Sequence, residues 1–226
     1  MKLNKIEFVL MNNPIRALIQ KKHEIRILRK ITPITNIEIA LEIGCGNGYG
    51  TKLIKEHFCP RRIEAIDLDK KMIQIARRKN KDSSIQYYVM DASTLSFADS
   101  TFDAIFDFGI IHHVPNWKDC ISEMHRVLRD NGEVILEELS IDTFSTLPGR
   151  IWKPLLDHPY NEMFSTDEFL ESLAAAGFAL QGFAESNPLR LFKYFSLAAK
   201  KQTAHNEPLQ SAGSSRASRR GRDRHA

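Results

Sequence analysis

The spacing of apolar and polar residues divides most of the chain into alternating strands and helices. Apolar runs of the length of buried strands occur at residues 37–43, 62–68, 85–91, 102–109 and 133–139. Between them, residues 49–58, 70–80 and 117–129 carry apolar side chains at helical spacing, and Asn131-Gly132 is a stop signal for the last of these helices. Strands that alternate with helices predict a mainly parallel sheet with helices on both faces.

The pattern changes toward the carboxyl end. Residues 165–178 predict a helix that opens with the capping-box pair Ser165 and Glu168. Two strand-like runs follow at residues 178–185 and 191–200, joined by only the five residues SNPLR. Because a parallel crossover needs a longer connection, these two runs predict an antiparallel hairpin.

Two basic segments flank the domain expected over residues 37–200. Residues 14–31, within the segment 1–36, place apolar side chains at helical spacing between Lys and Arg, which predicts a basic amphipathic helix. We expect it to pack on the domain; a lid over a substrate site and a peripheral contact with an anionic surface such as a membrane are the alternatives. Residues 201–226 have almost no large apolar side chains and predict a disordered basic tail, with an RNA-binding arm as the alternative.

Composition and charge narrow the class of protein. The 226 residues are 42% apolar and 27% charged, which is enough for one globular core. Residues 1–30 carry a net charge of +6 and residues 201–226 of +4, so the remainder is acidic and nucleic acid is not the expected partner. No apolar stretch approaches the roughly 18–20 residues of a membrane span, and the first residues do not resemble a signal peptide, so we expect a cytoplasmic protein.

Cysteine usage agrees with a reducing compartment. The three cysteines, Cys45, Cys59 and Cys120, are scattered along the chain. Their spacing is neither that of metal ligands nor that of a disulfide framework. The sequence therefore predicts no metal site.

The stretch ALEIGCGNGYG, residues 40–50, places glycines directly after the first predicted strand. A loop between a strand and a helix at the carboxyl edge of a parallel sheet is where such folds bind ligands, and glycines let a ligand approach the backbone. The spacing differs from the G-x-G-x-x-G of dinucleotide-binding folds. Glu42 would repel a pyrophosphate, whereas it suits a ligand with a cationic end, such as the ammonium and sulfonium of S-adenosylmethionine.

Acidic residues also end the next two predicted strands. Asp67 can accept hydrogen bonds from both hydroxyls of a ribose. Asp91, followed by the small Ala92, can accept from an adenine amino group, and Leu68 and Met72 are candidate walls for the purine. Any one of these acids alone could be a helix cap or turn residue. Their common position beside a glycine loop favours a nucleoside site.

Four motifs in order carry a family resemblance. The segments LEIGCGNGYG, IEAIDLD, VMDASTLSFADSTFDAIF and HRVLRDNGEVILEE resemble the successive motifs of class I S-adenosylmethionine-dependent methyltransferases, in the small-molecule branch called methyltransferase type 11. The resemblance covers about residues 38–140. It implies an α/β, Rossmann-like, doubly wound sheet of seven strands, mostly parallel with an antiparallel last strand. It also implies S-adenosylmethionine as cofactor, S-adenosylhomocysteine as product, and cofactor contacts at Glu42, Gly44, Cys45, Gly46, Gly48, Asp67, Leu68, Asp91, Ala92 and Phe108.

Methyl transfer is a direct displacement, so much of its acceleration comes from placing the acceptor in line with the sulfur–methyl bond. A general base helps only when the acceptor must lose a proton. His112 and His113, in the segment after the fourth predicted strand, are the first candidates for that base. His158 and Tyr160 are the second, because they lie in the insertion 141–164 that commonly roofs the acceptor site of this fold. For all four residues, packing or loop support is the alternative.

These features favour a methyltransferase with a small-molecule acceptor. Only the basic ends support an RNA or protein methyltransferase, and the chain has no Asn/Asp-Pro-Pro-Tyr/Phe motif. The glycine spacing and Glu42 disagree with an NAD-dependent oxidoreductase. A non-catalytic cofactor-binding protein stays open, as do the identity of the acceptor atom and the oligomeric state.

Overall fold

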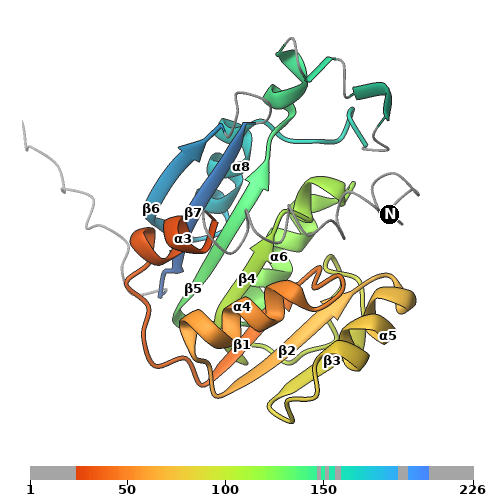
Figure 1. The fold of residues 1–226 in the computed structure, drawn as a ribbon. Coiled ribbons are helices and arrows are strands. Elements are labelled where there is room, and N and C mark those ends of the chain that lie inside the picture. Colours follow the sequence, from red (N-terminus) through yellow and green to blue (C-terminus); the bar gives the residue numbers. More distant parts are fainter. Residues whose placement is uncertain (1–23, 147–148, 151–152, 156–158, 188–192, 204–226) are drawn as a thin grey trace, which may run out of the picture.

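The structure is a computed structural model that describes residues 24–146, 149–150, 153–155, 159–187 and 193–203 (Figure 1). The strands are β1 (Ile39–Ile43), β2 (Arg62–Asp67), β3 (Ile85–Val89), β4 (Phe102–Phe108), β5 (Leu128–Leu139), β6 (Phe178–Ser186) and β7 (Tyr194–Lys201). The α-helices are α3 (Ile25–Ile31), α4 (Tyr49–Phe58), α5 (Lys70–Lys79), α6 (Trp117–Val127) and α8 (Thr166–Ala175). Short 3-10 helices occur at η2 (Ile111–His113), η3 (Ile141–Ser145) and η4 (Lys153–Leu155).

The seven strands form one sheet in the order β3-β2-β1-β4-β5-β7-β6. In this spatial order, the five strands β3, β2, β1, β4 and β5 are each parallel to their neighbours. Strand β7 is antiparallel to both β5 and β6. This arrangement confirms the predicted fold class and the terminal hairpin. The chain passes from β1 to β2 on one side and returns to β4 on the other, so the sheet has a topological switch point at β1 and β4. In open α/β sheets a ligand binds beyond the carboxyl ends of the strands at such a point.

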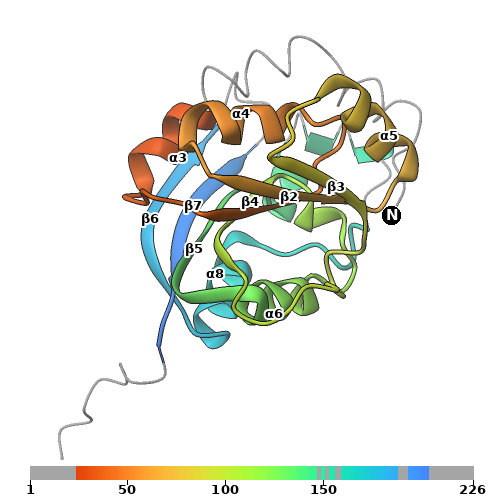
Figure 2. The ribbon, with the colours of Figure 1, turned by 90° about the horizontal axis from the view of Figure 1, so that it is seen from below.

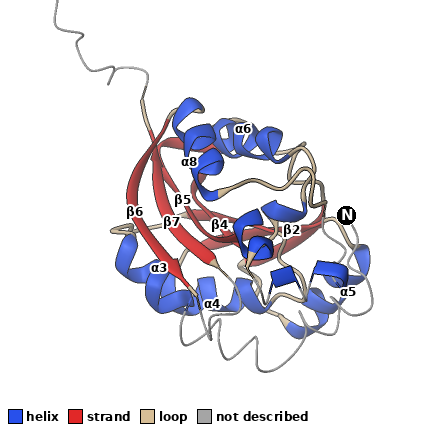
Figure 3. Cartoon of the chain, turned by 90° about the horizontal axis from the view of Figure 1, so that it is seen from above, coloured by secondary structure: helices blue, strands red, loops and turns tan. Residues whose placement is uncertain are grey.

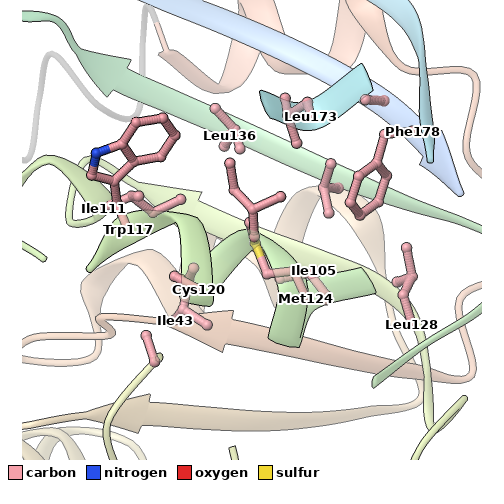
Figure 4. Close-up of a cluster of buried hydrophobic side chains, with 14 of the residues drawn as sticks. Ile43, Ile105, Ile111, Trp117, Cys120, Met124, Leu128, Leu136, Leu173 and Phe178 are labelled. Atoms are coloured by element: carbon pink, nitrogen blue, oxygen red, sulfur yellow. The ribbon is translucent and has the colours of Figure 1, made fainter. Parts of the chain in front are cut away.

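Helices cover both faces of the sheet, with α3, α4 and α5 on one side and α6 and α8 on the other (Figures 2 and 3). The strands alternate their side chains between two hydrophobic clusters, so that Ile105 of β4 points toward α6 and Phe106 toward the opposite layer. Figure 4 shows Cys120 and Met124 of α6 lying over Ile105. The helix buries its apolar stripe here, as its spacing predicts.

The boundary between α6 and β5 differs from the predicted one. The helix ends at Val127 rather than 129, and the strand begins at Leu128 rather than 133. Leu128 is fully buried and pairs with Phe102, and its carbonyl accepts a hydrogen bond of 2.8 Å from Lys201 Nζ. The predicted helix stop at Asn131-Gly132 is therefore wrong: both residues lie inside β5, where Asn131 adopts a φ of +64° in an irregular stretch of the strand.

The segments outside the strand–helix alternation are described in part. Helix α3 buries Ile25 and Leu28 against the domain, while residues 14–23 of the predicted amphipathic helix lie outside the described residues. The same holds for residues 204–226 of the predicted tail. Ser165 caps α8 by accepting a hydrogen bond of 3.2 Å from Glu168 N, as the capping-box pattern predicts. Among the described residues, no helix has the length and apolar character to span a bilayer.

Candidate cofactor site and active site

The glycine loop between β1 and α4 can form only because its glycines accept positive φ angles. Gly44, Gly46 and Gly48 have φ values of +65°, +51° and +83°. A Cβ atom at Gly44 would lie 2.3 Å from side-chain atoms of Ile110, so the loop packs directly on the segment that follows β4. By contrast, a Cβ at Gly46 would meet nothing within 4 Å, which leaves the backbone accessible at the middle of the loop.

Glu42 lies beneath this loop on β1 and points toward α4. Its side chain is 1% exposed, and its Oε2 accepts a hydrogen bond from the Thr51 hydroxyl. Its Oε1 lies against Gly50, where a Cβ atom would come within 2.2 Å. Burial raises the pKa of Glu42 to about 8; the Thr51 hydrogen bond opposes this shift, and the charges of Asp107 and Asp67 add to it. The carboxyl group therefore holds a proton at neutral pH, and a cation beside it would favour the ionised form.

Asp67, the last residue of β2, joins two loops. Its Oδ2 accepts a hydrogen bond of 2.8 Å from Gly46 N, and its Oδ1 accepts one of 2.7 Å from Asp69 N. Burial raises the pKa of Asp67, while these two amide hydrogen bonds oppose the shift. The carboxylate thus braces the glycine loop against the start of α5. Because a carboxylate has about four acceptor sites, the braced group can still accept from a ribose, which stays a prediction.

Residues that the sequence reasoning missed support the other end of the loop. Asn80 Nδ2 donates to the carbonyl of Gly48 at 3.2 Å and to the Tyr87 hydroxyl at 2.8 Å. A Cβ at Gly48 would lie 3.0 Å from that hydroxyl. These contacts tie the loop to α5 and β3. A tyrosine inside an otherwise apolar strand face is the only signal that the sequence offered for this brace.

The remaining predicted cofactor residues lie around the same edge. Strand β3 ends at Val89 rather than 91, and Asp91 stands in the following turn, where its Oδ1 accepts hydrogen bonds from Ser93 N at 2.9 Å and Ser93 Oγ at 2.8 Å. Asp91 is therefore a turn residue, and its contact with adenine stays a prediction. Ala92, Met72, Phe108 and Cys45 are buried, whereas Leu68 is 43% exposed.

His112 lies in η2, directly after β4, and belongs to a buried polar cluster. Its side chain is buried, and its Nδ1 atom is 2.6 Å from Glu138 Oε2. Its ring stands 4.2 Å from that of His113, measured between centroids. Glu138, near the end of β5, is fully buried, and its Oε1 accepts a hydrogen bond of 2.5 Å from Ile111 N. Glu138 follows another buried acid, Glu137, at the end of this strand.

A second carboxyl group, that of Asp107 on β4, lies beside Glu138. Burial and the charge of Glu138 raise the pKa of Asp107 well above its usual range. Burial also raises the pKa of Glu138, to about 7, although hydrogen bonds from Asp107 and from backbone amides oppose that shift. Of the two acids, Asp107 is therefore the one that keeps its proton as the pH rises, and Glu138 ionises first.

Comparisons with known proteins agree with this geometry. Residues 41–136 match the family model described as "Methyltransferase domain", of type 11. Residues 41–136 are a class I S-adenosylmethionine-dependent methyltransferase domain.

Two relatives and one solved structure show how far the similarity of this methyltransferase domain extends. The chain is 28% identical over 115 residues to phosphoethanolamine N-methyltransferase 2 of Caenorhabditis elegans, covering 50% of this chain and 26% of that protein. It is 33% identical over 92 residues to a fatty-acid O-methyltransferase of Mycolicibacterium smegmatis, covering 41% of this chain and 34% of that protein. The chain thus spans about a quarter to a third of the length of these relatives.

The crystal structure of an S-adenosylmethionine dependent methyltransferase from Mesorhizobium loti superposes with a TM-score of 0.64 at 19% identity. The superposition covers 77% of this chain and 95% of that chain. A likeness at this identity shows a shared methyltransferase fold.

The segment after β5 forms a small hydrophobic cluster with Leu139 at the end of that strand. The Tyr160 hydroxyl donates a hydrogen bond of 2.7 Å to the carbonyl of Lys153. The Tyr160 ring packs edge-on against that of Phe144, with 4.9 Å between the ring centroids. These contacts fit the packing role that was the alternative for Tyr160, and they leave its catalytic role a prediction. His158 lies outside the described residues. Among the described residues, no group of three or more His, Cys, Asp or Glu side chains could hold a metal ion.

Proposed function

We propose that this protein transfers the methyl group of S-adenosylmethionine to a small-molecule acceptor by direct in-line displacement. The observation that carries the proposal is the buried carboxyl group of Glu42 beneath a glycine loop at the switch point of the sheet. A carboxyl group in this place favours a ligand with a cationic end and disfavours the diphosphate of a nicotinamide dinucleotide. The match of residues 41–136 to a methyltransferase family supports the same choice.

The residues at the switch point fit this cofactor. Glu42 would meet its amino-acid end. The ammonium group there would favour the ionised form of this buried carboxyl and so lower its raised pKa. Asp67 and Asp91 would face its ribose and adenine, with Leu68 and Met72 beside the purine. When bound, S-adenosylmethionine supplies a methyl group already activated by the positive sulfur. The protein then has to orient an acceptor, exclude water and, for some acceptors, take up a proton.

The acceptor side of the proposal rests on the segment that follows β5. Leu139, at the end of β5, forms a hydrophobic cluster with Phe144 and Met163, and Ile141, Tyr160 and Tyr194 pack against it. Figure 1 shows this segment beyond the tip of β5, at the edge of the sheet where β1 and β4 also end. An apolar wall there favours a small acceptor with an apolar part. The names of the two relatives, which act on a fatty acid and on phosphoethanolamine, agree with an acceptor of small size.

Calorimetry tests the donor side directly. We expect S-adenosylmethionine and S-adenosylhomocysteine to bind one site on the full chain and NAD to show no binding heat. Binding of NAD in place of the adenosyl ligands would overturn the proposal. Decanoic acid, para-octylphenol and phosphoethanolamine then probe the acceptor side, with formation of S-adenosylhomocysteine as the readout. Bound donor without turnover on any of the three probes would contradict the proposed acceptor class.

A further inference from the structure

Backbone amides hold the side chain of Glu138 in place where it contacts His112. Its Oε1 accepts a hydrogen bond from Ile111 N, and its Oε2 lies 2.6 Å from His112 Nδ1 and 3.1 Å from the amide of Leu139. A carboxylate fixed by two backbone amides cannot turn away from the imidazole. Because Glu138 also has no exposed surface, water does not compete for its oxygens.

This contact fixes the tautomer of His112. A carboxylate only accepts hydrogen bonds, so Nδ1 of the imidazole must carry the proton that points at Glu138. The lone pair of the neutral ring then lies on Nε2, the atom that can accept a proton from elsewhere.

Resting on the proposed methyl transfer, we propose that Glu138 is a positioning residue that holds His112 as the proton acceptor for the methyl acceptor. In the step itself, a lone pair of the acceptor X–H forms a bond to the methyl carbon. The carbon–sulfur bond breaks, its electron pair stays on sulfur, and neutral S-adenosylhomocysteine results. The proton of X–H passes to Nε2 of His112, which becomes an imidazolium beside the charged Glu138.

The charges that face His112 suit this role. Glu138 approaches from β5, Asp107 from β4, and His113 from η2 itself, while Cys120 of α6 is buried beside the two acids. Glu138 accepts hydrogen bonds from two backbone amides, which favour its ionised form, so the negative charge of the acid pair lies in contact with the ring. An imidazolium formed there gains a buried ion pair with Glu138.

The proposal also selects a class of acceptor. A hydroxyl group loses its proton as its oxygen is methylated, and an ammonium group must first give up a proton so that its nitrogen has a lone pair; either acceptor therefore needs a base. A carboxylate is already ionised at neutral pH and does not. We therefore infer that the acceptor carries a hydroxyl or an ammonium group at the reacting atom.

Nuclear magnetic resonance of the histidine ring nitrogens tests the positioning directly, in the full chain with S-adenosylhomocysteine bound. His112→Gln assigns the signals of His112 among the eight histidines. We expect a protonated Nδ1 and an unprotonated Nε2 in the wild type, and in Glu138→Gln a loss of this tautomer with an at least tenfold weaker proton affinity. Glu133→Gln is the matched control, because Glu133 is a buried glutamate of the same strand that accepts a hydrogen bond from Thr32 far from His112. An unchanged tautomer and titration in Glu138→Gln would overturn the proposal.

Kinetics test whether the contact serves the reaction. With para-octylphenol as acceptor, we expect Glu138→Gln to slow methyl transfer about tenfold or more, and the double variant with His112→Gln to be no slower than His112→Gln alone. With decanoic acid, which needs no base, the loss of rate in both variants should be several times smaller than with para-octylphenol. Should Glu138→Gln fail to fold, Glu138→Asp withdraws the oxygen from Nδ1 while keeping the charge, and it should show the same selective loss.

The outcomes separate this inference from the proposed function. Methylation of decanoic acid but never of para-octylphenol or phosphoethanolamine would overturn the role of Glu138 and leave the proposed function standing. A loss of rate in Glu138→Gln that is equal for both kinds of acceptor would also overturn it, because it would indicate a purely structural role. Absence of S-adenosylmethionine binding to the wild type would overturn the proposed function itself.

Discussion

The buried carboxyl group of Glu42 makes a quantitative prediction about cofactor binding. Its pKa is raised to about 8, chiefly by burial, so the group is protonated in the protein at neutral pH. If the cationic end of S-adenosylmethionine binds the ionised form, binding must expel that proton. Below pH 8 the association constant should then rise about tenfold per pH unit, which corresponds to about 1.4 kcal/mol per unit.

Proton release on binding is the most direct assay. Calorimetry at about pH 6 and pH 7, in buffers of different ionisation enthalpy, should report close to one proton released per S-adenosylmethionine bound, since both values lie below the pKa of the carboxyl and of a typical α-amino group. Methylthioadenosine lacks the amino-acid end and should release none. In Glu42→Gln the release and the pH slope should both disappear. Glu56→Gln, on the exposed face of α4, should behave as the wild type.

One result would refute this reasoning. If the affinity for S-adenosylmethionine were the same at both pH values and no proton were released, Glu42 would not ionise on binding. Its buried hydrogen bond with Thr51 would then be a structural contact between β1 and α4, and the electrostatic argument for a cationic ligand would lose its support.

Three further predictions concern single side chains. Asp67→Ala should weaken S-adenosylmethionine binding by about 1.5–3 kcal/mol, because it removes charged hydrogen-bond acceptors; unchanged affinity in the folded variant would contradict the ribose assignment. Gly44→Ala should lower the free energy of unfolding by about 1–3 kcal/mol and Gly46→Ala by less, since only the first Cβ meets Ile110; chemical denaturation compares the two. Trp117→Ala should cost about 3–5 kcal/mol of stability but leave the affinity of folded protein for S-adenosylmethionine unchanged, as calorimetry below the unfolding transition can check.

The fold was readable from the sequence because its signals are local. Each parallel strand is a short apolar run, and the last two strand-like runs lie too close together in the sequence for a parallel crossover, which leaves a hairpin. The boundary at Leu128 was not readable, because it depends on distant partners. Leu128 continues a helical pattern in the sequence, yet its pairing with Phe102 and its hydrogen bond from Lys201 draw it into the strand.

The candidate cofactor site was predicted as a set of positions rather than as a set of contacts. The glycine loop and the acids Glu42 and Asp67 follow from their places at strand ends, which a parallel topology brings to one edge. Their partners do not follow. The hydrogen bond from the Thr51 hydroxyl to Glu42 depends on how α4 packs on β1. The hydrogen bond from Gly46 N to Asp67 depends on the path of the loop.

The orientation of Glu137 and Glu138 is the clearest case of missing information. An exposed strand reveals its phase by alternating apolar and polar residues, but β5 is central and both of its faces are covered by helices, so its inner residues are apolar on either side. Two adjacent glutamates at its end, both buried, are then equivalent in the sequence. Only the register decides between them: Glu138 shares the face of Val134 and Leu136, which is the face turned toward α6 and η2. The burial of β5 on both faces makes the strand easy to recognise in the sequence. For the same reason, the sequence gives no sign that Glu138 rather than Glu137 contacts His112.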